Sequence, residues 1–387
     1  MPESKQKQRF WRLITVCIFL WMGSVQAAAD FPYGSAESLG DHLFEDASLS
    51  EPAGQSCASC HDAKAGFSDP VHRRPVSPGV RSGAAGNRNA PSIAYAAFIP
   101  PRHIEASSGL YIGGLFWDGR AATLEEQAAG PLLNMQEMAN PDKASVIAKV
   151  RRSAYAAEFE FAYGSQIWGN VNLAFTRVTE AIAAYERTPE FAPFSSKYDA
   201  WLAGKVRLTP SERRGLDLYE GQAMCSACHP NRPDALNPHP LFTDHSYDNI
   251  GVPVNPANPF YQQPVSVNPK GRKFVDYGLG ADLKDGMQAG KFKVPSLRNI
   301  AITAPYMHNG YFTTLEGAIA FYNNRDRRPR CRTDRLSAAD AIRLACWPAP
   351  ETDVNVNASE LGGLGLTHRD IADLAAFLRT LTDGYTR

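Results

Sequence analysis

The sequence predicts a mainly α-helical protein with long loops, little β-structure and two domains related by duplication. Apolar residues recur at helical spacing in several segments, and no segment shows a sustained strand-like alternation. A five-residue cysteine motif also occurs twice, once in each half of the chain. The 387 residues are enough for two domains of ordinary size.

Three segments carry the clearest helix signals. Segment 366–382 places its leucine and phenylalanine residues on one stripe, with a capping signal at Thr367. Segment 208–222 has a Thr-Pro pair at Thr209, which is typical of an N-cap followed by the first helical residue. Segment 172–187 has the pattern of another amphipathic helix.

The N-terminal residues 1–29 have the pattern of a secretory signal peptide. A basic start precedes an apolar stretch over 13–25, and small residues precede Asp30. A retained membrane anchor is the alternative, although the apolar run is short for a membrane span. We expect cleavage near residues 27–29 and export to a bacterial periplasm, with no other segment able to enter a bilayer.

The charges are balanced, because the 40 Lys and Arg residues equal the 40 Asp and Glu residues. Nothing in this balance favours binding to a nucleic acid or to an anionic membrane surface.

The motifs "CASCH" and "CSACH" are typical of covalent attachment of c-type haem. Two thiols one helical turn apart can add to the two vinyl groups of one haem, and the adjacent histidine then lies under the iron as its proximal ligand. A redox-active cysteine pair and half a zinc site are the alternatives, but each pair is followed directly by histidine. The predicted attachment residues and proximal ligands are Cys57, Cys60, His61, Cys225, Cys228 and His229.

Three further cysteines lie outside the two motifs. Cys17 would be removed with the signal peptide. Cys331 and Cys346 most simply form a disulfide in an oxidising compartment, and two free buried thiols are the alternative.

A fainter repeat accompanies the two motifs. When Gly119 of "FWDGRAATLEEQAAGP" is set against Gly310 of "YMHNGYFTTLEGAIAFY", Pro131 falls opposite Tyr322. Proline offers no ligand, whereas a tyrosine oxygen can bind ferric iron. The alignment therefore predicts a first haem with an open face and a second haem closed by Tyr322, unless Tyr322 is an ordinary core aromatic residue.

Taken together, these motifs resemble the bacterial diheme cytochrome c peroxidases and, among them, the MauG-like proteins. The resemblance also includes "RNAPS", "NMQEM", "VPSLRNIAITAPYMHNGYFTTLE" and the tyrosine fourteen residues after His308. It implies two cytochrome-c-like domains after the signal peptide. Residues 30–200 would hold the open, peroxide-binding haem, and residues 201–387 would hold a six-coordinate electron-transfer haem.

Two positions favour the MauG-like branch within this resemblance. The position of Tyr322 carries methionine in the peroxidases that oxidise small cytochromes and tyrosine in MauG-like proteins. Those peroxidases also carry a distal histidine in an "SxGH"-like stretch, which here is "SPGV", ending in Val80. His72 is the nearby candidate for a distal ligand, with a surface histidine as the alternative. Both differences from those peroxidases predict that the first haem has an open distal face even when the protein is fully oxidised.

The resemblance also assigns roles around the first haem. Glu137 matches the distal acid/base residue, Gln127 matches its hydrogen-bonding partner, and Pro131 and Met138 would line the open pocket. Trp117 matches a tryptophan that carries electron holes between the haems. From spacing alone, the glutamate and glutamine could be solvated helix residues and the tryptophan a core residue.

The resemblance further implies one calcium ion between the domains. Its ligands would be the Asn89 side chain and the backbone carbonyls of Thr303 and Pro305, which are hard oxygen donors. "RNAPS" could otherwise be a simple turn before a proline. His308 would lie beside the second haem in a structural or electron-transfer role.

Three functions fit these residues. The first is a MauG-like oxidase that uses hydrogen peroxide to oxidise a partner protein. The second is a peroxidase supplied with electrons by a small cytochrome c or a cupredoxin, and the third is a diheme electron carrier without catalysis. In MauG a surface tryptophan passes electron holes to the protein substrate, and Ala223 occupies that position here. The sequence therefore does not identify the residue through which oxidising equivalents leave. The resemblance is also compatible with a homodimer.

Overall fold

The computed structural model describes residues 31–71, 74–233 and 237–386. The predicted signal peptide and His72 lie outside these residues. Residues 32–387 form one compact unit, and the description below concerns that unit alone. Among the described helices, none is long and apolar enough to cross a membrane.

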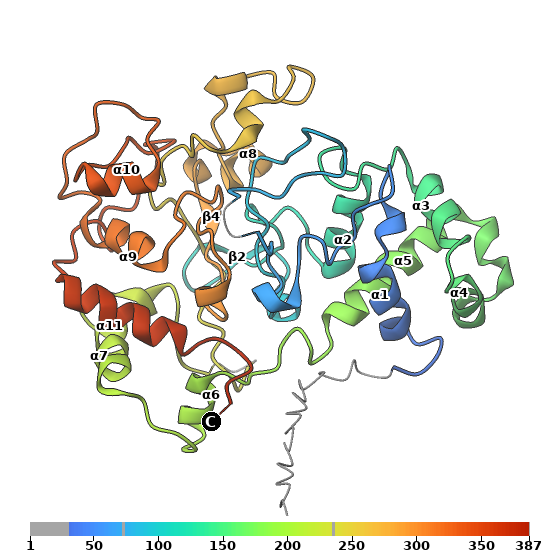
Figure 1. The fold of residues 1–387 in the computed structure, drawn as a ribbon, viewed down its shortest axis with the longest axis horizontal. Helices are drawn as coiled ribbons and strands as arrows, with labels where there is room; N and C mark the ends of the chain where they lie inside the picture. The colour runs from blue at the N-terminus through green and yellow to red at the C-terminus, as the bar shows by residue number, and fades with distance from the viewer. Residues whose placement is uncertain (1–30, 72–73, 234–236, 387) are drawn as a thin grey trace, which may run out of the picture. The chain divides into compact units, whose positions relative to one another are not determined.

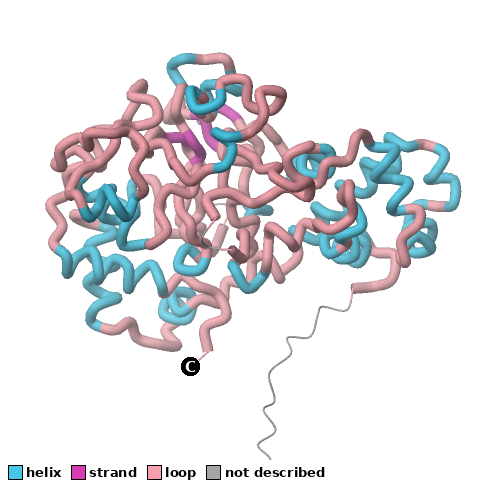
Figure 2. The backbone as a smooth tube through the Cα atoms, turned by 45° about the horizontal axis from the view of Figure 1, so that its top comes forward, coloured by secondary structure: helices cyan, strands magenta, loops and turns pink. Residues whose placement is uncertain are grey.

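The prediction of a mainly helical chain with little β-structure is confirmed (Figure 1). Long loops connect the elements, and the strands of the described part of the chain form two antiparallel pairs, β1 with β2 and β3 with β4 (Figure 2). The helices of the described residues are α1 (Ala36–Glu45), α2 (Leu124–Leu133), α3 (Lys143–Val150), α4 (Ala156–Tyr163), α5 (Val171–Glu186), α6 (Lys197–Leu202), α7 (Pro210–Glu220), α8 (Leu279–Leu283), α9 (Leu315–Asn324), α10 (Ala338–Arg343) and α11 (His368–Arg379). The strands are β1 (His103–Ile104), β2 (Tyr111–Ile112), β3 (Tyr247–Asp248) and β4 (Phe292–Lys293).

The three predicted helices are α5, α7 and α11. A capping box begins α7, in which Thr209 and Glu212 exchange side-chain-to-backbone hydrogen bonds. Another begins α11, formed by Thr367 and Asp370. These caps satisfy N–H groups that the first helical turn leaves without partners, which is why the helices begin where the sequence predicts.

The buried apolar side chains form two hydrophobic cores. One core takes its residues from α1 to α5 and the loops between them, and the other is built mainly from α7, α9, α10 and α11. Figure 1 shows α1 to α5 together at one end of the unit and α7, α9, α10 and α11 together at the other. The division at residue 200 stays a prediction: the first core extends to Ile182, and Tyr198 already packs in the second core.

A glycine lies at a close helix contact in each core. A Cβ atom on Gly40 of α1 would lie 2.1 Å from the Ala181 carbonyl oxygen of α5. A Cβ atom on Gly215 of α7 would lie 2.0 Å from the Asp373 carbonyl oxygen of α11. No side chain fits at such distances, so each half contains the same glycine-dependent helix crossing. This equivalence supports the predicted duplication.

The aligned repeat has the same backbone in both copies. Gly119 has φ +68° and Gly310 has φ +63°, and a threonine N-cap begins the helix that follows each glycine. This left-handed conformation favours glycine. The same isolated antiparallel bridge encloses each turn, Leu115 with Ala121 and Tyr306 with Phe312.

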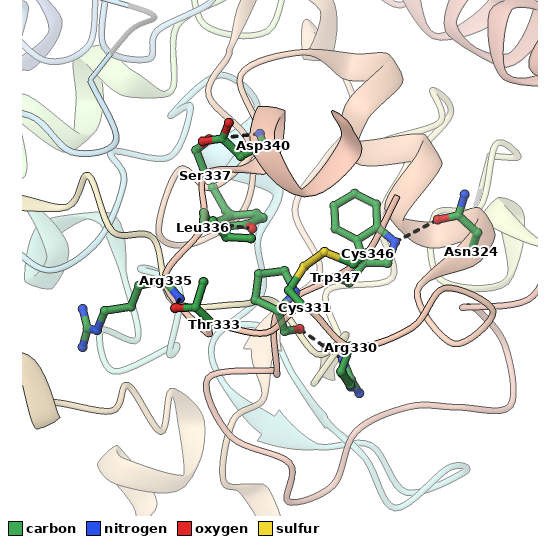
Figure 3. The surroundings of a disulfide bond; sticks show 12 residues. Asn324, Arg330, Cys331, Thr333, Arg335, Leu336, Ser337, Asp340, Cys346 and Trp347 are labelled. Atoms are coloured by element: carbon green, nitrogen blue, oxygen red, sulfur yellow. Dashed lines mark hydrogen bonds between the residues drawn. A yellow bond between two sulfur atoms is a disulfide. The ribbon is translucent and has the colours of Figure 1, made fainter. Parts of the chain in front are cut away.

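Cys331 and Cys346 form a disulfide with an S–S distance of 1.94 Å (Figure 3). It joins the loop after α9 to the end of the α10 region. Beside it, Trp347 is fully buried and donates from its indole Nε1 to Asn324 Oδ1 at 2.8 Å. The disulfide therefore fixes a surface loop to the core that contains α9.

Candidate functional site

Two cavities of about 250 and about 260 Å³ lie within the described residues. The first cavity is lined by Cys57, Cys60 and His61, and the second by Cys225, Cys228 and His229. Their volumes are nearly equal, and each combines two thiols with one imidazole. The structure therefore places the two sequence motifs at two equivalent sites.

Each motif forms one helical turn at the wall of its cavity. The His61 N–H donates to the Cys57 carbonyl at 3.0 Å, and the His229 N–H donates to the Cys225 carbonyl at 2.9 Å. Such i to i+4 bonds place the first cysteine and the histidine one turn apart. Both then face the same space, as attachment of one planar cofactor requires.

Burial raises the pKa of all four motif thiols. The pKa reaches about 11 for Cys60 and about 12 for Cys225 and Cys228, and that of Cys57 is raised further. A redox-active cysteine pair needs a thiolate and hence a lowered pKa. The environment of both motifs therefore opposes the alternative of a redox pair.

The two histidines are held in the same orientation. His61 Nδ1 lies 3.0 Å from the Phe67 carbonyl oxygen, and His229 Nδ1 lies 2.9 Å from the Phe242 carbonyl oxygen. A carbonyl only accepts, so Nδ1 carries the proton in both rings. Burial lowers the pKa of both histidines, which keeps the imidazoles neutral. Each Nε2 therefore keeps its lone pair for a metal.

The two phenylalanines extend the repeat beyond the segments that the sequence singled out. Phe67 and Phe242 both have φ +57°, a left-handed value that is strained for a bulky residue. They lie in the similar stretches "GFSDP" and "LFTDH". The similarity of these two stretches could have identified Phe67 and Phe242 as a repeated pair. Their contact with the histidines, however, is visible only in the structure.

The residues predicted around the first haem lie together. Gln127, Pro131, Glu137 and Met138 all line the first cavity with His61. Burial raises the pKa of Glu137, although the charge of Arg120 and a hydrogen bond with Asn134 act in the opposite direction. A carboxyl with a raised pKa is a stronger proton acceptor than an ordinary glutamate, as an acid/base residue requires.

The "SPGV" segment lies directly against this glutamate. The Val80 N–H donates to the Glu137 carbonyl at 2.9 Å, and Pro78 lines the first cavity. The valine side chain offers no ligand. His245 lines the first cavity together with His61, and the sequence analysis did not identify it because it lies far along the chain from the first motif.

The second cavity contains Tyr322 and His229. Tyr322 lies in α9. In the aligned repeat, α9 corresponds to α2 of the first half, and Tyr322 corresponds to Pro131. Burial raises the pKa of this tyrosine. The structure therefore brings the predicted ligand pair into one cavity.

His308 also lines the second cavity, stacked on Phe292 with ring centroids 3.6 Å apart. Its Nε2 atom is buried without a hydrogen-bond partner among the described residues, and the nearest acidic oxygen, on Glu351, is 3.6 Å away. A buried polar atom without a partner is typical of a site where a bound ligand supplies the missing hydrogen bond.

One wall is common to both cavities. Trp117, Asn89 and Lys293 line both of them, and the Trp117 indole donates to the Asn89 carbonyl at 2.9 Å. Lys293 donates from its backbone to the Trp117 carbonyl at 2.8 Å and from Nζ to the Gly114 carbonyl at 2.6 Å. Burial lowers the pKa of Lys293 to about 7. Sequence reasoning missed this lysine, since nothing in its neighbourhood marks it as buried.

A buried ion-pair network supports the wall. Arg88 of "RNAPS" binds Asp276 with two hydrogen bonds and Asp118 with a third, all between 2.6 and 2.8 Å. Burial alone would raise the pKa of Asp276, but the Arg88 guanidinium holds it at about 2. Through Arg88 the network joins the segment of Asn89 to the segment of Trp117. Through Asp276 it joins both to the second half of the chain.

The residues predicted for calcium lie at the edge of the second cavity. Asn89, Thr303 and Pro305 all line it. The Asn89 amide donates from Nδ2 to the Pro75 carbonyl at 3.1 Å, which directs Oδ1 away from that contact. The described residues contain no cluster of three His, Cys, Asp or Glu side chains suited to a metal. The three oxygen donors are all neutral, so they suit a hard cation that keeps water ligands.

Glu186 at the end of α5 is a second residue that the sequence did not reveal. Its side chain lines the first cavity, and its Oε2 atom is buried without a partner among the described residues. Burial raises its pKa to about 8, despite the opposing charge of Arg187. The carboxyl is therefore protonated at neutral pH.

This burial predicts a pH-dependent stability. Between the ordinary pKa of 4.5 and the folded value of about 8, the folded protein binds a proton that the unfolded chain releases. The free energy of unfolding should then fall with rising pH, by at most about 1.4 kcal/mol for each pH unit from this group. Glu186→Gln should remove that dependence and stabilise the protein at pH 8. Chemical denaturation at several pH values measures it.

Glu180→Gln, on the same helix but partly exposed, is the matched control and should leave the pH dependence as it is. Equal pH profiles for the wild type and Glu186→Gln would contradict the assignment of a protonated carboxyl.

Comparison with known proteins agrees with this geometry. A family profile described as di-haem cytochrome c peroxidase matches residues 35–207. The methylamine utilization protein MauG of Paracoccus denitrificans is 42% identical over 354 residues, covering 89% of this chain and 88% of the relative. The cytochrome c551 peroxidase of Nitrosomonas europaea is 33% identical over 282 residues, covering 73% of this chain and 70% of the relative.

A solved structure is similar over nearly the same extent. The diheme peroxidase BthA from Burkholderia thailandensis aligns with a TM-score of 0.76 and 35% identity, covering 92% of this chain and 88% of BthA. The similarity therefore spans both cavities and the wall between them.

Proposed function

Because the chain belongs to the di-haem cytochrome c peroxidase family, we propose that its two haems have different tasks. Membership makes the protein a peroxide-dependent oxidoreductase with two covalently bound haem c groups that oxidises a redox partner. The third hypothesis, an electron carrier without catalysis, is thereby set aside. In our proposal the first site reduces hydrogen peroxide and the second exchanges electrons with the donor.

The residues of both cavities fit a covalently attached haem. Each cavity presents two protonated thiols and a neutral histidine whose Nδ1 is held by a backbone carbonyl, and the second also contains the orphan Nε2 of His308. His61 and His229 would be the proximal ligands, and the two cysteine pairs would form the thioether bonds.

The first cavity carries the groups needed for peroxide cleavage. When bound, a haem iron with an open position supplies a binding site for peroxide and the electrons that break the O–O bond. Glu137 would take the proton from the nearer peroxide oxygen and deliver it to the farther one, which leaves as water. Gln127 would donate a hydrogen bond to the departing oxygen, while Pro131 and Met138 contribute apolar surface to the same cavity.

The observation that carries the assignment of tasks is the placement of Tyr322 in the cavity of His229. A tyrosine oxygen is an anionic, hard ligand that favours oxidised iron, whereas Pro131 at the equivalent position of the first cavity offers none. Trp117, in the common wall, would conduct electrons between the two sites. This combination supports the MauG-like reading over a peroxidase that needs prior reduction.

The experiment is to add one equivalent of peroxide to the fully oxidised protein without a reductant. A near-infrared charge-resonance band that appears as the ferric spectrum bleaches would support the MauG-like function. A protein that reacts only after one haem is reduced would instead be a peroxidase served by a small cytochrome c or a cupredoxin, and His72 would then be the first residue to test.

We further propose that Asn89, Thr303 and Pro305 hold one calcium ion. Their common position at the second cavity supports this, and so do their hard oxygen donors. Metal analysis of the purified protein should find one calcium per chain, and a calcium-free protein with both haems intact would refute the site.

We also propose that residues 1–29 direct export to the periplasm. The basic start and the apolar stretch support this, as does the oxidised cysteine pair at Cys331 and Cys346. N-terminal sequencing of the mature protein tests it, since cleavage should leave a new terminus near Asp30.

A further inference from the structure

A path of aromatic rings leads from the residue that holds His229 towards the surface. It begins at Phe242, whose carbonyl oxygen lies 2.9 Å from His229 Nδ1. The Phe242 and Tyr198 rings have centroids 5.1 Å apart, and the Tyr198 and Trp201 rings have centroids 5.3 Å apart. Phe242 and Tyr198 are buried, whereas Trp201 is partly exposed. Two ring contacts therefore separate the residue that orients His229 from solvent.

We propose that Trp201 is the residue at which the external donor delivers its electrons to the second haem site. This inference rests on the proposed function, and it supplies an exit for the oxidising equivalents at a residue other than position 223. Ala223 itself is buried and cannot be oxidised, so it offers no such route.

The electron count closes with one-electron steps. Reduction of one hydrogen peroxide to two water molecules takes two electrons and two protons. Trp201 would pass one electron through Tyr198 and Phe242 to the second site and regain one from the donor. Two donor molecules, each losing one electron, or one donor losing two in succession, complete one turnover, and the protons come from solvent through Glu137.

The chemistry of the three rings favours the tryptophan as the terminal site. Tyr198 is buried, its hydroxyl donates to the Asn231 carbonyl at 3.2 Å, and burial raises its pKa to about 12. A carbonyl cannot accept a proton, so oxidised Tyr198 would have to retain its own. Phenylalanine is harder still to oxidise. The positive charge is therefore best accommodated on the large indole of Trp201, which water reaches.

The helix that carries Trp201 is held rigidly. Ser196 and Asp199 form a capping box at the start of α6, and Asp199 accepts two hydrogen bonds from Arg298, at 2.9 and 3.0 Å. Arg298 is itself buried, with its guanidinium carbon 5.8 Å from the centre of the Phe242 ring. The same arginine thus hydrogen-bonds to the helix of Trp201 and lies near the Phe242 ring at the other end of the aromatic path.

An arginine that is paired with an aspartate lies over part of the Trp201 ring. The Arg213 guanidinium carbon lies 6.0 Å from the ring centre, and Arg213 pairs with Asp217 at 3.2 Å. Leu202, beside the tryptophan, is 48% exposed. The indole thus lies at the surface between an ion pair and an exposed leucine, where a donor can approach to within electron-transfer distance.

Trp168 provides a matched control within the same chain. It is also partly exposed and stacks on Phe159 with ring centroids 5.2 Å apart. Among the described residues, no hydrogen bond joins Trp168 or Phe159 to a motif histidine, whereas the Phe242 carbonyl contacts His229. Both tryptophans are therefore accessible to direct oxidation from solvent, whereas the proposed path reaches Trp201 and not Trp168.

The test is to treat the oxidised holoprotein with peroxide in the absence of a donor and to locate oxidised residues by peptide mass spectrometry. Without a donor, the oxidising equivalents should accumulate at Trp201, which we expect to be oxidised several-fold more than Trp168. In Trp201→Phe the peroxide-induced optical change should decay several-fold more slowly than in the wild type, and Trp168→Phe should decay at the wild-type rate.

The two proposals fail in different ways. If the wild type shows no optical response to peroxide, the proposed function is wrong. If it responds and consumes peroxide but Trp201 and Trp168 are oxidised equally, or Trp201→Phe decays at the wild-type rate, the exit at Trp201 is wrong while the proposed function stands.

Discussion

Replacing Glu137 by glutamine should lower the turnover number for peroxide reduction by about 10²–10⁴-fold. Glutamine has nearly the same shape, so the first cavity should keep its form, but it cannot accept the peroxide proton. The variant should bind both haems normally. Stopped-flow measurement of the peroxide-induced optical change, together with steady-state consumption of peroxide, would give the loss.

The pH profile separates this role from a structural one. Burial raises the pKa of Glu137, and only the ionised form can accept a proton. The wild-type rate should therefore rise with pH through a pKa above the ordinary range of glutamate, and this limb should vanish in Glu137→Gln. Glu126→Gln, on α2 but outside both cavities, should keep the wild-type profile. If Glu137→Gln retained full activity, the proton acceptor would have to be another group of the first cavity, such as His245.

Replacing Tyr322 by methionine should raise the reduction potential of the second haem by on the order of 100 mV or more. A thioether favours reduced iron, whereas a phenolate oxygen favours oxidised iron. The variant should also lose the near-infrared band after addition of peroxide to the oxidised protein. Spectroelectrochemical titration measures the first effect and optical spectroscopy the second.

Tyr306→Phe is the matched control for this experiment. Tyr306 is buried and lines the second cavity with Tyr322, so the substitution changes a tyrosine in the same surroundings. It should leave the potential and the band unchanged. Equal behaviour of Tyr322→Met and the wild type would mean that Tyr322 is a core aromatic residue and not a ligand.

The local features of this fold were predictable from the sequence. The motifs that carry Cys57 and Cys225 are short and contiguous, and the caps at Thr209 and Thr367 depend on residues three positions away. The repeat around Gly119 was also visible in the sequence. Its turn has a positive φ, which favours glycine, so the same residue type occurs in both copies. In each case the residues that interact are close in the sequence.

The residues that sequence reasoning missed are brought to the cavities by long loops without periodicity. Lys293 is a lysine, which is rarely buried, and only its partners Trp117 and Gly114 in the other half explain its place. Glu186 ends an amphipathic helix, where glutamate is normally solvated. Pattern analysis assigns such residues to the surface, since it cannot see contacts that form between distant segments.

The common wall has a consequence for how the holoprotein is assembled. The first cavity takes one side from residues 241–245 and 293–296, although its attachment motif lies at residues 57–61. A chain synthesised from its N-terminus presents Cys57, Cys60 and His61 long before those later segments exist. The wall of the first cavity is therefore complete only when residues 241–245 and 293–296 have folded against the segment of the first motif.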